Sequence, residues 1–303
     1  MARSWYVLKK YKALYFLMLP GILYYLIFKY APMYGIIIAF QDFSIGRGIM
    51  GSKFVGLKHF HEFFVNTPDA WKLIRNTIML NIYGLLLQFP APIVLAVLFH
   101  ELRFKWFKRF VQSVSYMPHF LSTVVIAGIL VTFLSPSTGI VNFLLVKWFG
   151  IEPIMFLGLP EWFRTIYVGS EIWQGVGWGT ILYLAAIAGV DPTLYEAAKM
   201  DGANRFQQIR HITFIGMVPV MIILLVLNLG HFMEVGFQKI LLLYNSMNYE
   251  TSDVINTFVY RRGVLDADFS FATAVGLFQS AIGFLLVVTA NRIVRKYSDT
   301  SLW

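Results

Sequence analysis

Residues 191–206 read DPTLYEAAKMDGANRF, a polar segment that lies between two long apolar stretches. The apolar stretches run from about Ile166 to Val190 and from about Ile212 to Met233. A helix needs about 20 apolar residues to cross the hydrocarbon core of a bilayer. Both stretches reach that length, so the segment between them is predicted to connect two transmembrane helices on one face of a membrane.

The rest of the chain has the same organisation. Four further stretches qualify as spans, and they run from about Ala13 to Phe40, Ile74 to Phe99, Phe110 to Leu134 and Phe271 to Ile293. Of the 303 residues, 58% are hydrophobic and only 14% are charged, against about 25% charged in a soluble domain. No linker or internal repeat interrupts residues 1–303. The sequence therefore predicts an all-α membrane protein, a single domain with six transmembrane helices.

The positions of the basic residues predict the orientation in the membrane. They cluster before the first span, in the second and fourth loops and after the sixth span, and all of these segments lie on one side. These residues are Arg3, Lys9, Lys10, Lys12, Arg103, Lys105, Lys108, Arg109, Lys199, Arg205, Arg210, Arg292, Arg295 and Lys296. Loops on the cytoplasmic side carry an excess of Lys and Arg. Both termini and the segment 191–206 are therefore expected to be cytoplasmic.

Composition also bears on the kind of site the chain can carry. Cysteine is absent, which excludes disulfides and thiolate metal sites. The net charge of +9 comes from clusters beside apolar runs, a pattern typical of topology control rather than of nucleic-acid binding. The histidines are scattered, and no set of carboxylates or histidines has catalytic or metal-binding spacing. We therefore expect neither a metal site nor enzyme chemistry on this chain.

The segment 191–206 favours a helix-turn-helix. Thr193 and Glu196 have the spacing of a capping box, so a helix is predicted to begin near Thr193. Gly202 can adopt the positive φ that ends such a helix, and a second short helix is expected from Ala203 towards the fifth span. Such a unit can dock on another protein, or it can be an ordinary amphipathic helix at the membrane interface.

The motif in this segment resembles the EAA loop of binding-protein-dependent ABC import permeases. The matching residues are Glu196, Ala197, Ala198, Asp201, Gly202, Ala203, Ile212 and Pro219. Residues 116–125 resemble the third-span signature of the carbohydrate-uptake permeases, and residues 291–303 resemble the tail of their LplB-like oligosaccharide branch. Ile215 departs from the pattern, since the family often has proline there. The resemblance implies the six-span, MetI-like permease fold.

The resemblance also implies a function and a set of partners. The segment at about 191–207 would be a coupling helix that sits in a groove of a separate ATPase subunit. The residues implied in this contact are Glu196, Ala197, Ala198, Asp201, Gly202, Ala203 and Phe206. No Gly-Lys dipeptide occurs in the chain, so it has no phosphate-cradling P-loop, and ATP and Mg are expected on the ATPase. A second related permease subunit, an ATPase dimer and an extracytoplasmic solute-binding protein would complete an oligosaccharide importer in a bacterial plasma membrane.

Two spans carry candidate sugar-binding residues. Polar groups inside a span are costly unless they face a cavity or one another. In the fourth span one helical face carries four candidates at i, i+3, i+4 and i+7, and in the fifth span two candidates are three residues apart. These candidates are Glu171, Gln174, Gly175, Trp178, Asn228 and His231. The Trp ring offers a flat platform for a sugar, and the polar groups offer partners for hydroxyls.

Each of these candidates has a structural alternative. Glycines in spans commonly serve helix packing, and His231 can simply bond a neighbour. Glu171, which disfavours an acidic sugar, can instead pair with an external basic residue. Further polar residues in the spans are expected to make interhelical hydrogen bonds rather than to touch substrate, and these are Asn81, Gln88, His119 and Gln279.

Two other functions stay open from the residues alone. A secondary transporter driven by an ion gradient requires buried ionisable relays and internal repeats, and a membrane enzyme acting on lipid-linked glycans requires clustered catalytic groups at one interface. Neither function accounts for the EAA loop. The sequence leaves open which oligosaccharide is carried and whether it is acidic.

Overall fold

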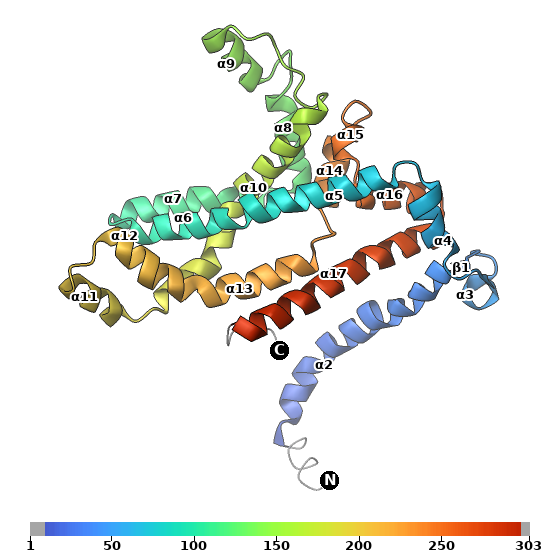
Figure 1. Ribbon diagram of the computed structural model, residues 1–303, viewed down its shortest axis with the longest axis horizontal. Coiled ribbons are helices and arrows are strands. Elements are labelled where there is room, and N and C mark those ends of the chain that lie inside the picture. The colour runs from blue at the N-terminus through green and yellow to red at the C-terminus, as the bar shows by residue number, and fades with distance from the viewer. Residues whose placement is uncertain (1–9, 298–303) are drawn as a thin grey trace. The chain divides into compact units, whose positions relative to one another are not determined.

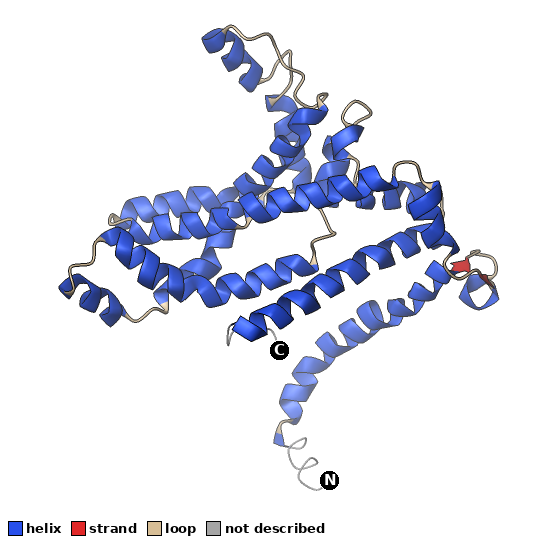
Figure 2. Cartoon of the chain, viewed as in Figure 1, coloured by secondary structure: helices blue, strands red, loops and turns tan. Residues whose placement is uncertain are grey.

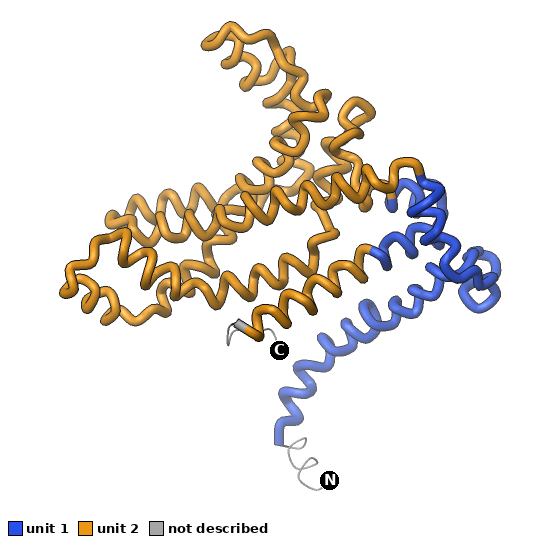
Figure 3. The backbone as a smooth tube through the Cα atoms, viewed as in Figure 1, with its two compact units in different colours: residues 1–67, 259–278 blue, residues 68–258, 279–303 orange. Residues whose placement is uncertain are grey.

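The computed structural model describes residues 10–297, and helices make up most of this part of the chain (Figures 1 and 2). Arg3, Lys9, Leu302 and Trp303, which contribute to the predicted orientation and resemblance, lie outside the described residues. The chain divides into two compact units, the first of residues 1–67 and 259–278 and the second of residues 68–258 and 279–303 (Figure 3). The single domain stays a prediction.

The first unit contains the first predicted span and a short antiparallel strand pair. Short 3-10 or π-helical segments are labelled η. Its elements are α2 (Lys12–Tyr25), η1 (Leu26–Tyr30), η2 (Ala31–Phe40), β1 (Gln41–Asp42), α3 (Gly48–Gly51), β2 (Lys53–Phe54), α4 (Lys58–His61), η3 (Glu62–Asn66), η7 (Arg261–Leu265) and the start of α17 (Phe269–Tyr297). Gln41 pairs with Phe54 and Asp42 pairs with Lys53.

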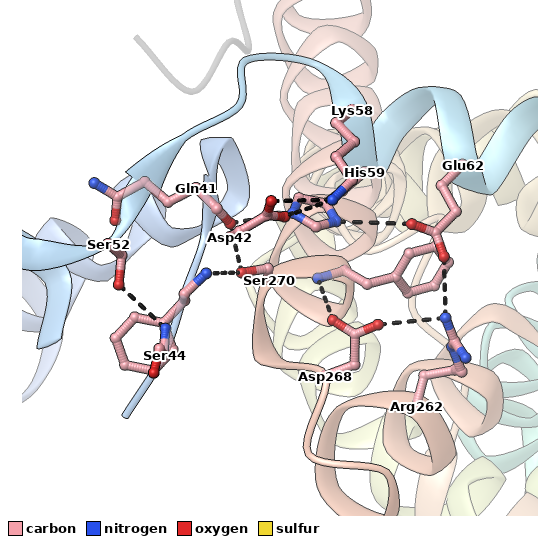
Figure 4. A network of polar contacts seen from close by, with 12 residues as sticks. Gln41, Asp42, Ser44, Ser52, Lys58, His59, Glu62, Arg262, Asp268 and Ser270 are labelled. Carbon is pink, nitrogen blue, oxygen red and sulfur yellow. Dashed lines mark hydrogen bonds and ion pairs between the residues drawn. The ribbon is translucent and has the colours of Figure 1, made fainter. Parts of the chain in front are cut away.

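A polar network holds the β1 segment to the start of α17 within this unit (Figure 4). The buried Ser270 hydroxyl donates to the carbonyl oxygen of Gln41 at 2.6 Å and accepts the N–H of Phe43 at 2.9 Å. Arg262 lies 3.1 Å from a Glu62 oxygen and 3.3 Å from an Asp268 oxygen. Side chains distant in sequence therefore satisfy the backbone where the first span ends.

The second unit carries most of the helices. Its elements are α5 (Ala70–Tyr83), η4 (Gly84–Gln88), α6 (Pro90–Glu101), α7 (Lys105–Tyr116), η5 (Met117–Phe120), α8 (Thr123–Phe133), α9 (Ile140–Phe149), α10 (Pro160–Ala188), α11 (Pro192–Met200), α12 (Arg205–Gln208), η6 (Ile209–Thr213), α13 (Phe214–Gly230), α14 (Phe237–Leu243), α15 (Tyr249–Ser252), the first part of α16 (Ile255–Tyr260) and the end of α17. The short helices α11 and α12 lie at one end of this unit, and α14 and α15 lie towards the other (Figure 1).

Six segments fit the predicted spans. Four helical segments are long and apolar enough to cross a membrane, and they are Lys12–Phe40, Ala70–Glu101, Arg205–Gly230 and Phe269–Lys296. Two bent helix pairs raise the number to six, and they are Lys105–Phe120 with Thr123–Phe133 and Pro160–Ala188 with Pro192–Met200. The all-α, six-span prediction is confirmed when each bent pair is counted as one span; the first bend lies within the third span and the second lies between α10 and α11.

The third span is not the continuous helix predicted over Phe110–Leu134. The α7–η5 segment and α8 meet at an angle of 100°. Pro118 lacks a backbone N–H, so the α-helix ends at Tyr116 and continues only as the 3-10 turn η5. Leu121 is then extended, with ψ at 138°. Ser122 then accepts the N–H of Val125 at 3.3 Å and starts a new helix as its N-cap.

Helix α10 is the centre of the second unit and packs against α6, α7 and α13. Tyr183 and Ile187 of α10 are buried with Ile93 and Ala96 of α6 and with Met217 of α13. Close approach to α7 and α6 depends on two glycines. A side chain at Gly177 would overlap the Ser115 carbonyl of α7, and one at Gly179 would come within 2.9 Å of Pro92.

Candidate functional site

Gly175 differs from the two packing glycines of α10. A Cβ atom placed at Gly175 would meet no atom within 4 Å, and the residue lines two cavities. Helix packing therefore accounts for Gly177 and Gly179 but leaves the surface at Gly175 open. Gly175 and Glu171 line both cavities, so they mark the place where the two cavities adjoin.

The first cavity has a volume of about 380 Å³ and lies between the α5–η4–α6 segment, α10 and α13. Its polar side chains include Asn81, Gln88, Glu171 and Asn228. The amides of Asn81 and Asn228 each donate to a carbonyl of their own helix, at 2.9 Å. Among residues 10–297 their amide oxygens accept no hydrogen bond, so these groups can serve the cavity as acceptors.

The second cavity has a volume of about 630 Å³ and is lined from α8, α10, α14 and the bend of the third span. Its polar side chains include His119, Glu171, Gln174 and Lys239. Sites for small ligands in proteins commonly occupy about 300 to 1,000 Å³ and carry a few placed polar groups. Both cavities fall within that range.

A buried lysine that the sequence analysis did not single out organises the second cavity. The Lys239 side chain is only 2% exposed and forms an ion pair with Glu171, which is 31% exposed. Its Nζ atom also donates to Gln174 Oε1 at 2.8 Å. The alternative that Glu171 pairs with a basic residue outside the spans is thus confirmed. Because Lys239 balances its charge, Glu171 no longer argues against an acidic sugar. The signal in the sequence was a lone lysine in the apolar run that begins at Phe237.

Trp178 is placed differently from the other candidates of α10. Its ring stacks on His119, with centroids 4.6 Å apart and planes 3° apart, and the edge of Phe120 approaches it at 5.7 Å. Trp178 is 45% exposed but lies outside the lining of both cavities. An interhelical hydrogen bond was expected from His119, but its ring stacks on Trp178 instead.

His231 also lies outside both cavities. Its side chain is 73% exposed, and Nδ1 lies 3.1 Å from Glu234 Oε2. A sugar-binding role for Trp178 and His231 stays a prediction. Of the further polar residues, Gln279 makes the expected interhelical bonds, to the carbonyl of Met233 at 2.8 Å and to Asn256 at 3.1 Å.

The predicted helix-turn-helix is present as α11 and α12, but its caps differ from the prediction. The side chain of Asp191, not of Thr193, accepts the first free N–H, at 2.9 Å, because Pro192 occupies the first helical position. The capping box belongs to Asn204 and Gln207, whose reciprocal bonds measure 2.9 and 2.7 Å. Gly202 has the predicted positive φ, at +79°.

This loop presents an exposed surface while two contacts hold it to the spans. The exposed residues are Glu196, Ala197, Asp201, Gly202 and Phe206, and Ala198 and Ala203 are half-buried. Tyr195 Oη lies 3.0 Å from Thr213 Oγ1, and its ring lies 6.0 Å from that of His100. The surface is exposed, and Tyr195 joins it to the second and fifth spans.

Within residues 10–297, no group of three or more His, Asp or Glu side chains is arranged to hold a metal ion. The polar groups at the cavities are amides, the hydroxyls of Thr123 and Tyr183, one carboxylate, one ammonium and one imidazole. Such groups bind hydroxyls and carboxylates by hydrogen bonds. The site is therefore suited to reversible binding of a polar solute.

Comparisons with known proteins identify the family of the chain. Residues 88–299 match the family described as binding-protein-dependent transport system inner membrane component. The polygalacturonan/rhamnogalacturonan transport system permease protein YteP of Bacillus subtilis strain 168 is 46% identical over 292 residues, which are 96% of this chain and 90% of that protein. Protein LplB of the same organism is 44% identical over 301 residues, 99% of this chain and 94% of that protein.

Solved structures match over the whole fold. A chain in the crystal structure of a bacterial ABC transporter involved in the import of the acidic polysaccharide alginate has a TM-score of 0.89 and 43% identity, covering 98% of this chain and 100% of that one. A chain of a bacterial alginate ABC transporter in complex with an alginate pentasaccharide-bound periplasmic protein has a TM-score of 0.91 and 43% identity, covering 99% and 100%.

Proposed function

Because the chain belongs to the family of binding-protein-dependent transport inner membrane components, it is a permease subunit of an ABC importer, and we propose that it carries a polysaccharide-derived oligosaccharide. It is a multi-pass membrane protein and is not itself an enzyme. The oligosaccharide class is supported by the names of its relatives, which include a polygalacturonan/rhamnogalacturonan permease and an alginate importer.

The observation that carries this proposal is the pair of adjoining cavities at Glu171 and Gly175. They place amide, carboxylate and ammonium groups along α10, α13 and α14, where a polar solute crossing the membrane needs hydrogen-bond partners. We assign substrate contact to Glu171, Gln174, Gly175 and Asn228 on this ground, and to Trp178 and His231 on the sequence pattern alone.

ATP is bound by a partner in this proposal. The chain contains no Gly-Lys dipeptide and so lacks the P-loop lysine. ATP and Mg then belong to a separate ATPase dimer, and the chain itself needs no cofactor. The exposed surface of α11 and α12 is the docking element, with Glu196, Asp201 and Phe206 pointing to solvent. The partners are this ATPase, a second permease subunit and an extracytoplasmic solute-binding protein.

The proposed mechanism links α11 to the spans that line the first cavity. The excess of basic residues supports a cytoplasmic position for both termini and α11. Closure of the ATPase dimer moves α11, and the contacts of Tyr195 with Thr213 and His100 pass this movement to the second and fifth spans. Because those spans line the first cavity, access changes from one side to the other. The sugar shifts this equilibrium only through its differential affinity for the two states.

The test measures ATP hydrolysis stimulated by sugar and binding protein, with the permease pair and ATPase co-purified into lipid nanodiscs. The variant Gly202→Asp is expected to lose stimulation while the permease pair still assembles. Gly150→Asp is the matched control, because Gly150 also has a positive φ, at +65°, and no atom near its Cβ position, but lies at the end of α9. It should keep full stimulation.

Two outcomes would contradict the proposal. A chain that never associates with an ATPase, or that transports sugar without one, favours the secondary transporter instead. Equal loss of stimulation in Gly202→Asp and Gly150→Asp would leave the importer function standing but would overturn the coupling role of the α11 loop.

A further inference from the structure

The second cavity holds a buried positive charge from α14. Lys239 is 2% exposed, and a buried ammonium group is tolerated only when it is paired and hydrogen-bonded. Glu171 supplies the charge, and Gln174 supplies a second acceptor at 2.8 Å. Gln174 is oriented for this task, because its Nε2 atom donates to the Leu121 carbonyl at 3.3 Å and leaves its oxygen towards the lysine.

Lys239 has capacity for one more partner. An ammonium group carries three N–H donors, and among the described residues its acceptors are Glu171 and Gln174. The residue lines the 630 Å³ cavity, so the third donor can serve an acceptor that enters there. Glu171 is more exposed than its partner and also lines the first cavity, so it has space to turn away.

We propose that Lys239 binds a carboxylate of an acidic sugar in the second cavity, and that Glu171 is the internal competitor which that carboxylate displaces. This inference rests on the proposed importer function and adds a specificity-determining pair to it. When a sugar carboxylate replaces the Glu171 carboxylate, Lys239 still faces one negative charge, so the buried ammonium group stays paired. A neutral sugar lacks the charge to do so, because hydrogen bonds to charged groups are stronger than those between neutral groups.

The proposal predicts opposite effects for the two halves of the pair. Removing the lysine removes the group that selects acidic sugar. Removing the charge of Glu171 removes the competitor, so acidic sugar binds Lys239 more readily. A purely structural ion pair predicts instead that both changes harm the protein in the same way, since either one leaves a buried charge without its partner.

The experiment measures ATP-driven uptake into proteoliposomes that contain the complete complex with its binding protein. The probes are a galacturonic acid pentasaccharide and the same sugar with its carboxyl groups reduced. The readout is the uptake of the acidic sugar divided by the uptake of the neutral sugar. Because the binding protein is the same in every variant, its own selectivity cancels when the ratios of two variants are compared. Lys239→Gln is expected to lower this ratio about tenfold, and Glu171→Gln is expected to raise it.

Glu161→Gln is the matched control, because it neutralises an exposed carboxylate in the first turn of the same helix, and the ratio should not change. Equal loss of both sugars in Lys239→Gln, or a lowered ratio in Glu171→Gln, overturns the inference. If the parent complex imports only the neutral sugar, the inference fails and the importer function stands. If it imports neither sugar, the inference fails, and ATP hydrolysis stimulated by binding protein and sugar decides the importer function separately.

Discussion

The hydroxyl oxygens of Tyr195 and Thr213 lie 3.0 Å apart and join α11 to the start of the fifth span. Thr213 is fully buried, so the Tyr195 hydroxyl reaches from an exposed loop into the packed end of the helices. The ring of the same tyrosine lies against His100 at the end of α6. One side chain therefore contacts both spans that α11 would have to move.

Tyr195→Phe is expected to weaken coupling without preventing assembly. The change removes one hydrogen bond worth about 1 kcal/mol and keeps the ring contact with His100. Sugar transported per ATP hydrolysed should fall about fivefold. Thr213→Val removes the same bond from the other side, so the double variant should behave like either single variant in a double-mutant cycle. Tyr25→Phe, at an exposed tyrosine of α2, is the control. Additive losses would contradict the role of this bond.

The second prediction concerns two glycines of α10, of which Gly177 serves helix packing and Gly175 faces the path proposed for the sugar. Gly177→Ala would place a methyl group on the Ser115 carbonyl, so α7 and α10 must separate at a cost of about 1 to 3 kcal/mol. Gly175→Leu meets open space and projects where the two cavities adjoin. We expect Gly177→Ala to lower the melting temperature in detergent. Gly175→Leu should leave it nearly unchanged and reduce sugar uptake.

The reverse result would be informative. If Gly175→Leu melts early, the residue serves helix packing, as glycines in spans often do. Normal uptake by a stable Gly175→Leu variant would show that sugar does not pass this point of α10.

The sequence predicted the spans and the helix-turn-helix of α11 and α12 because both depend on local patterns. Apolar length alone identifies a span, and Gly202 alone marks the turn, since few other residues adopt a φ of +79° without strain. The cap was misassigned to Thr193 because a capping box can be satisfied at several registers. Pro192 and Asp191 settle the register, and their effect depends on the backbone at that turn.

The site was less predictable because it depends on residues far apart in the sequence. Lys239 and Gln174 are separated by 65 positions, and no local period shows that α14 folds back onto α10. The face carrying Glu171, Gln174 and Gly175 was visible from helical spacing, and those residues do meet at one cavity. Trp178 shares that face but stacks on His119, which only the bend of the third span brings near.

A third prediction concerns Ser270 in the first unit (Figure 4). Its hydroxyl is buried, donates to Gln41 and accepts from Phe43. Ser270→Ala leaves both backbone groups without that partner, at a cost of about 2 kcal/mol. The segment after the first span should open more often, and trypsin should cleave after Arg47 and Lys53 faster. Thr273→Ala, at an exposed hydroxyl of the same helix, should leave cleavage unchanged. Equal cleavage in both variants would contradict the role of Ser270.

The last prediction is an acid sensitivity of the β1–β2 pair. The hydrogen bond from Lys58, at 2.8 Å, holds the pKa of Asp42 below its usual range. A carboxyl group whose pKa is lower in the folded state contributes stability that is present above its unfolded pKa, about 3.9. That stability is lost as the pH falls through the folded value. Asp42 is 40% exposed, so the effect is small, as for other surface ion pairs.

The measurement is hydrogen exchange of the Val55 amide, which donates to the Phe40 carbonyl at 2.8 Å beside the strand pair. Its protection factor in the parent chain should fall as the pH drops below about 4, the usual pKa of a free Asp carboxyl. Asp42→Asn removes the titrating group, so its protection should start lower and change less over this range. The same fall in both proteins would assign the acid sensitivity to another carboxylate of the network, such as Glu62 or Asp268, whose partner is Arg262.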